Sequence, residues 1–177
     1  MNCRICCPAG PWESDVNEDE TLRIEAETLR QQGYKHHMAG ELADAILCYN
    51  RSIATYPAAE AYTLLGWAYS MIDLYDEAQA MCKKAIELDP GLGNPYNDIG
   101  SYLIEQNRWE EAIPWLEEAT KAPRYESPEF AYTNLGRVYE HFGDYYQALI
   151  YFNRALAVAP LYMPAEWARN QLLCKLN

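Results

Sequence analysis

Three cysteines near the start of the chain are the residues whose type and spacing most directly suggest site chemistry. Cys3, Cys6 and Cys7 form a C-x-x-C-C cluster, and a C-x-x-C pair can supply two thiolates to a zinc ion. A stable zinc site usually needs four ligands, and neither a second C-x-x-C nor a paired-histidine motif follows. We therefore predict no metal site and no cofactor, and we keep a thiol or metal sensor as the third hypothesis for function.

The usual motifs of catalysis are missing from the chain. It has no glycine-rich phosphate loop, no G-x-S-x-G elbow and no H-E-x-x-H pair. The histidines are His36, His37 and His141, and the last two fall in the first and last units of a repeated pattern, too far apart to act together. We therefore expect a protein that is not an enzyme.

A repeated order of small, turn and bulky residues organises the chain from about residue 26 to residue 160. Close-packing glycines recur at Gly33, Gly66, Gly100 and Gly136. A turn position follows each of them, at Gly40, Asp73, Asn107 and Gly143. Small residues come next, at Ala45, Ala78, Ala112 and Ala148, and then bulkier ones, at Tyr49, Cys82, Leu116 and Phe152. Apolar residues at helical spacing, interrupted by residues that tolerate a left-handed turn, predict paired helices.

This order, with a period of about 34 residues, resembles the tetratricopeptide repeat family. The resemblance implies an all-α, right-handed α-solenoid of four helix-turn-helix repeats with a C-terminal capping helix. We expect a loosely ordered tail at 1–17 and repeats within 18–160, at about 18–58, 59–92, 93–128 and 129–162. The capping helix is expected at 163–177, where an apolar stripe comprises Leu161, Trp167, Leu172, Leu173 and Leu176.

In that family the concave face is lined mainly by the first helix of each repeat, so the resemblance implies a peptide-binding groove there. The candidate groove residues are Tyr34, His37, Trp67, Asn97, Asn134 and Arg137. The aromatic members offer contact area, the two asparagines can donate to and accept from a peptide backbone, and the arginine can pair with a carboxylate. The connector Lys121 to Pro128 reads as a loop whose Arg124 and Tyr125 are a further contact point.

Some family members clamp the C-terminal carboxylate of a chaperone with a cluster of lysine, arginine and asparagine. The corresponding places here hold Arg30, Tyr34, Leu64, Asn94 and Asp98 or, one unit later, Thr63, Trp67, Asp98, Phe130 and Asn134. Neither register supplies the positive cluster, and Asp98 would repel a carboxylate. A chaperone C-terminal tail is therefore a disfavoured partner.

Charge and hydropathy narrow the class of partner. The chain of 177 residues has 14 Lys and Arg against 26 Asp and Glu, for a net charge of −12, and such a surface repels nucleic acid. No apolar run reaches the roughly 18 residues of a membrane helix, and no apolar signal segment opens the chain. We expect a soluble, cytoplasmic protein without a membrane partner.

Two hypotheses for function remain beside the sensor. The first is a non-catalytic adaptor or scaffold that binds a peptide segment of a partner protein in the groove. The second is a structural or assembly subunit that self-associates or docks through convex or terminal surfaces.

Overall fold

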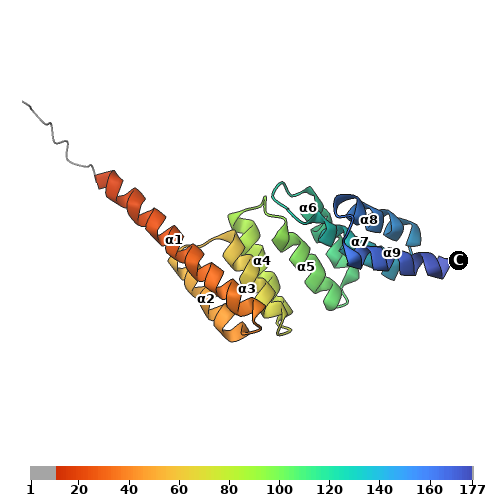
Figure 1. Cartoon of the computed structure of the whole chain (residues 1–177), viewed down its shortest axis with the longest axis horizontal. Coiled ribbons are helices and arrows are strands. Elements are labelled where there is room, and N and C mark those ends of the chain that lie inside the picture. Colours follow the sequence, from red (N-terminus) through yellow and green to blue (C-terminus); the bar gives the residue numbers. More distant parts are fainter. Residues whose placement is uncertain (1–10, 177) are drawn as a thin grey trace, which may run out of the picture. The chain divides into compact units, whose positions relative to one another are not determined.

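The computed structural model describes residues 11–176, with side chains described from residue 18 onward. Cys3, Cys6 and Cys7 lie outside the described residues, together with the sensor hypothesis placed on them. Within the described range, nine α-helices joined by short connections account for the regular secondary structure (Figure 1). The chain divides at Pro57 into two compact units, which we call unit 1 and unit 2.

Unit 1 is one helical hairpin. Helix α1 (Pro11–Met38) packs against α2 (Leu42–Thr55). The periodic pattern predicts the start of α1 near Glu18, whereas the helix begins at Pro11, and proline favours the first helical position because its fixed φ is helical and its missing N–H would have no intrahelical partner there. Across the hairpin, Ser52 Oγ donates a 2.7 Å hydrogen bond to the backbone oxygen of Ala26.

Unit 2 contains three helix pairs and a last single helix. The pairs are α3 (Ala59–Ser70) with α4 (Tyr75–Leu88), α5 (Asn94–Glu105) with α6 (Trp109–Lys121), and α7 (Pro128–His141) with α8 (Tyr145–Val158). Helix α9 (Met163–Leu176) packs on α8 and α7, and the first helices α3, α5 and α7 contact one another in turn. The predicted all-α fold of helix-turn-helix repeats followed by a C-terminal helix is confirmed.

The turns within the pairs are built alike in both units. Positive φ occurs at the four predicted turn residues, Gly40 (80°), Asp73 (60°), Asn107 (60°) and Gly143 (77°). In each turn the next residue donates its backbone N–H five positions back, in the bonds Glu41 to His36, Leu74 to Tyr69, Arg108 to Leu103 and Asp144 to Tyr139. This 6→1 bond is the Schellman motif, which satisfies a carbonyl at the helix end and turns the chain sharply.

The close-packing glycines lie directly under the bulky residues of the second helices. At Gly136, a Cβ atom would overlap the ring of Phe152, and Phe152 itself is fully buried. The same relation joins Gly33 to Tyr49, Gly66 to Cys82 and Gly100 to Leu116. The glycine therefore lets the two backbones of a pair approach until the second helix fills the space that a side chain would occupy.

The connector between α6 and α7 is held against the connector between α4 and α5. The backbone N–H of Gly93 donates to Arg124 O at 3.0 Å, and Arg124 N–H donates to Gly91 O at 3.0 Å. The Tyr125 side chain lies directly over Gly93, where no Cβ intervenes. Arg124 also forms ion pairs with Glu60 and Asp89. The spacing from Gly100 to Gly136 is 36 residues, against 33 and 34 between the earlier close-packing glycines, so the third repeat is longer by about two residues. Its longer connector forms a clasp between loops, in which Arg124 and Tyr125 contact the protein itself.

Replacing Tyr125 with alanine is expected to lower the free energy of unfolding by about 1–2 kcal/mol, because a half-buried ring is lost from Gly93. Urea denaturation of the full chain measures this change. Tyr125→Phe serves as the control: the Tyr125 hydroxyl is buried without a hydrogen bond, so its removal should leave stability unchanged or slightly raised. A loss from Tyr125→Phe as large as the loss from the alanine variant would contradict the role assigned to the ring.

Candidate functional site

A chain of polar side chains runs between the first helices α5 and α7 of unit 2. Asn134 Nδ2 donates to Asn97 Oδ1 at 3.1 Å, and Asn97 Nδ2 donates to Asp98 Oδ1 at 3.3 Å. At the other end, Arg137 donates to Asn134 Oδ1 at 3.3 Å and lies 3.5 Å from Glu105 Oε1. We call these five residues the α5–α7 polar chain. It brings together three of the candidate residues predicted from the sequence, Asn97, Asn134 and Arg137.

The residues of the α5–α7 polar chain are half-buried or exposed. Asn97 and Asn134 are half-buried, and the side chain of Arg137 is 42% exposed. One hydrogen bond joins the two amides, and a second bond of each, from Arg137 to Asn134 and from Asn97 to Asp98, fixes its orientation. The remaining amide hydrogens and lone pairs are available to a peptide backbone.

Trp67, the fourth candidate in unit 2, lies on the adjacent first helix α3 and is 36% exposed. The exposed part of the indole offers apolar contact area and a ring face for a cation, while the remainder of the side chain is buried against the protein. Trp67 therefore adds an aromatic element to the first-helix surface that carries the polar chain.

The two candidates in unit 1 differ from each other. Tyr34 is 45% exposed, whereas His37 is 4% exposed. The His37 ring packs edge-on against Tyr49, with which it shares a 3.3 Å hydrogen bond. Burial lowers the pKa of His37 and raises the pKa of Tyr49 to about 12. His37 therefore offers almost no surface to a ligand, because its ring packs against Tyr49 of α2.

Asp98 also lies on this surface, although it is not one of the six candidate residues predicted from the sequence. From the sequence, its negative charge indicated only that an acidic chaperone tail would be repelled. The residue as a whole is half-buried, and desolvation raises the pKa of its carboxyl from 3.8 to about 7, against the lowering effect of the Asn97 hydrogen bond. A strongly shifted carboxyl on an accessible surface is typical of a functional site.

The residues around Asp98 come from three different elements. Burial, followed by the charge of Asp98, raises the pKa values of the Cys82 thiol on α4, the Tyr102 hydroxyl on α5 and the Tyr125 hydroxyl in the clasp. The hydroxyls of Tyr102 and Tyr125 are both buried without a hydrogen-bond partner. Asp98 therefore faces polar groups that do not neutralise it. In the sequence, the only indication that Asp98 belongs to the site is its position two residues before Gly100.

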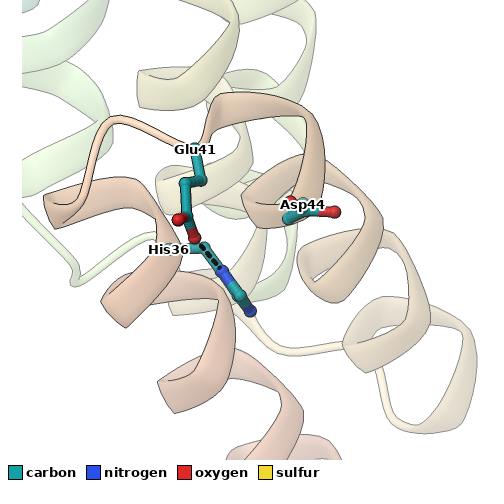
Figure 2. A group of neighbouring side chains, drawn as sticks. All are labelled: His36, Glu41 and Asp44. Carbon is teal, nitrogen blue, oxygen red and sulfur yellow. Dashed lines mark hydrogen bonds and ion pairs between the residues drawn. The ribbon is translucent and has the colours of Figure 1, made fainter.

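One group in unit 1 has the composition of a metal site. His36, Glu41 and Asp44 place one possible ligand atom each within 4.8 Å of one another (Figure 2). The arrangement is explained without a metal: His36 Nδ1 lies within hydrogen-bonding distance of Glu41 Oε2, at 2.6 Å, and Asp44 lies in the first turn of α2, where the helix dipole favours an acid. A divalent cation would gain at most three protein ligands here, on an exposed surface.

His141 and three cysteines are the other side chains with reactive chemistry in the described part of the chain. His141 stacks on Trp109, with ring centroids 4.1 Å apart. Cys82 is buried, Cys48 is half-buried and Cys174 is exposed. Over the same residues, no helix combines the length and the apolar character that crossing a lipid bilayer requires.

Comparisons with known proteins agree with the helix pairs. The sequence profile of the tetratricopeptide repeat matches residues 59–92, and a second profile of the same repeat matches residues 97–162. The small glutamine-rich tetratricopeptide repeat-containing protein 2 of Mycosarcoma maydis is 32% identical over 96 residues, which are 54% of this chain and 27% of that protein. The first curated relatives are much longer than the matched regions, which span 20 to 28% of their lengths.

Solved structures show the same architecture. PilF of Pseudomonas aeruginosa superposes with a TM-score of 0.80 at 26% identity, covering 86% of this chain and 70% of that one. The second repeat domain of Spaghetti (RPAP3), solved with the HSP90 peptide SRMEEVD, superposes with a TM-score of 0.55 at 25% identity, covering 59% of this chain and 98% of that one. The repeated helix pairs, the glycine positions and these matches together show that the chain belongs to the tetratricopeptide repeat family.

Proposed function

We propose that the protein is a non-catalytic adaptor that binds a peptide segment of a partner protein on the first helices of unit 2. The observation that carries the proposal is the α5–α7 polar chain, in which hydrogen-bonded asparagines and an exposed arginine line adjacent first helices. Oriented amides can bond an extended backbone, and Arg137 can pair with an acidic group. Members of the family bind protein or peptide partners, and the peptide held by the Spaghetti domain is one example.

The chemistry of the surface narrows the class of peptide. An acidic tail such as SRMEEVD would bring carboxylates toward Asp98, so we expect chaperone tails of this kind not to bind here. Trp67 favours a segment with an apolar or cationic side chain near α3. The partner is expected to be a protein, with no nucleic acid involved.

Changing Trp67 to alanine and Arg137 to glutamate together is expected to weaken binding of peptides selected from a random display library at least tenfold, about 1.4 kcal/mol. The physical reason is the joint loss of aromatic area and of the cation that orients Asn134. Fluorescence anisotropy with labelled peptides measures the affinity, and circular dichroism checks that the variant is folded.

The matched control replaces Tyr146 with alanine and Arg154 with glutamate, two exposed residues of the second helix α8. This double variant makes the same kinds of change away from the first helices and should bind as the wild type does. Equal affinities in all three proteins would move binding to another surface.

A second function, self-association through a terminal surface, is favoured by one observation. Only Leu172 of the predicted stripe is buried, while Trp167 is 64%, Leu173 40% and Leu176 51% exposed on α9. Measurement of the molar mass by light scattering in dilute solution separates the two functions, because an assembly subunit would form dimers or larger species.

A further inference from the structure

Asp98 is a carboxylate without a counter-ion. Among the described residues it forms no ion pair, and its hydrogen bond from Asn97 engages Oδ1 alone. Its Oδ2 atom therefore has no donor within the described part of the chain. The side chain is only half-buried, so a group from outside can still reach it.

The neighbours of Asp98 do not supply the missing charge. Helix α4 contributes the Cys82 thiol, α5 itself contributes the Tyr102 hydroxyl, and the clasp contributes the Tyr125 hydroxyl. All three are neutral or become negative when they ionise. On α7 the nearest cation of the polar chain, Arg137, is engaged with Asn134 and Glu105. Removing a charge from water without a partner is costly, and carboxyls in such surroundings cluster at functional sites.

The chemistry of the missing group follows from these contacts. It must be positive, it must donate at least one hydrogen bond to Oδ2, and it must reach a half-buried position from the surface. A lysine ammonium or an arginine guanidinium on a flexible stem meets all three requirements. The net charge of −12 would in addition attract a basic segment over longer distances.

We propose that Asp98 is the binding site for a lysine or arginine side chain of the partner peptide, held between the α5–α7 polar chain and the clasp. This assignment rests on the proposed function, since it names the residue that the bound segment must carry. Asn97 is a positioning residue in this site: its amide holds Oδ1 and leaves Oδ2 for the ligand.

The experiment starts from peptides selected at about pH 8 from a random display library with the full-length protein. We expect one peptide position to be enriched in lysine or arginine. A selected peptide is then synthesised with arginine or with its neutral isostere citrulline at that position. The citrulline peptide should bind the wild type about tenfold or more weakly, whereas Asp98→Asn should bind the two peptides within about twofold of each other.

The control is Glu110→Gln, which makes the same change in charge at an exposed residue in the first turn of α6, outside the polar chain. It should keep the preference of the wild type for arginine. A measurement on the wild type alone covers the case in which Asp98→Asn fails to fold: the arginine preference should shrink as the pH falls from about 8 to about 5.5 and Asp98 takes up a proton.

The outcomes separate this assignment from the adaptor function. Selected peptides without a basic position, or citrulline bound as tightly as arginine, would overturn the role of Asp98 and leave the adaptor function intact. An equal loss of preference in Glu110→Gln would assign the effect to overall charge. A library that yields no binder would overturn both proposals.

Discussion

Replacing Asp98 with asparagine is expected to raise the free energy of unfolding by about 2–3 kcal/mol at pH 8, with almost no effect near pH 4. The pKa of this carboxyl is raised from 3.8 to about 7, so between these values the folded protein holds a proton that the unfolded chain has released. The wild type therefore loses stability as the pH rises from about 4 to about 7. Asparagine removes that loss and can still accept the hydrogen bond from Asn97.

Urea titrations followed by tryptophan fluorescence measure this change, because Trp67, Trp109, Trp115 and Trp167 all belong to unit 2. The expected gain is below the roughly 4 kcal/mol of the full pKa difference, since the side chain is partly exposed and water reduces the penalty. Glu110→Gln should change stability by less than about 0.5 kcal/mol at either pH. An Asp98→Asn variant with the same stability gain at both pH values would show that ionisation of the carboxyl is not the cause.

Replacing Phe152 with alanine is expected to lower the free energy of unfolding of unit 2 by about 3–5 kcal/mol. The ring is fully buried against Gly136 and in one cluster with Ala148 and Leu172. Gly136, which lies directly against the ring, has no side chain that could move into the space, so much of the cavity should persist. The same urea titration measures the loss.

Leu161→Ala provides the control for that experiment, since Leu161 is 91% exposed and its truncation should change stability by less than about 0.5 kcal/mol. Gly136→Ala should also destabilise in the wild type, because a Cβ would overlap the Phe152 ring, and should destabilise less in Phe152→Ala, where the space is open. Independent, additive effects of the two substitutions would show that they do not share one packing site.

The repeated frame could be predicted because its determinants lie within one helix pair. A glycine, a turn residue and a bulky residue at fixed spacing specify one local geometry, and Gly136, Gly143 and Phe152 occupy their expected roles. The apolar stripe of α9 has helical spacing and so predicts the helix correctly. The spacing does not show which residues of the stripe face α8. Only Leu172 of that stripe is buried.

The site was only partly predictable because it depends on contacts between pairs. The positions of Asn97 and Asn134 followed from the family resemblance, whereas their hydrogen bond depends on the distance between α5 and α7. The shifted pKa of Asp98 results from burial in the folded protein, and the groups whose pKa values its charge raises, on α4, α5 and in the clasp, lie far apart in the sequence. The extra length of the third repeat was visible, but its docking on Gly93 was not.

The clasp changes how unit 2 should come apart. In an array where each repeat contacts only its neighbours, segments can unfold one after another from an end. Here the backbone bonds of Gly91 and Gly93 with Arg124 join the two connectors that flank α5 and α6. The α5–α6 pair cannot unfold while these connectors stay hydrogen-bonded to each other. The amide hydrogens of Gly93 and Arg124 should therefore exchange with solvent in one cooperative step, more slowly than loop amides elsewhere in unit 2.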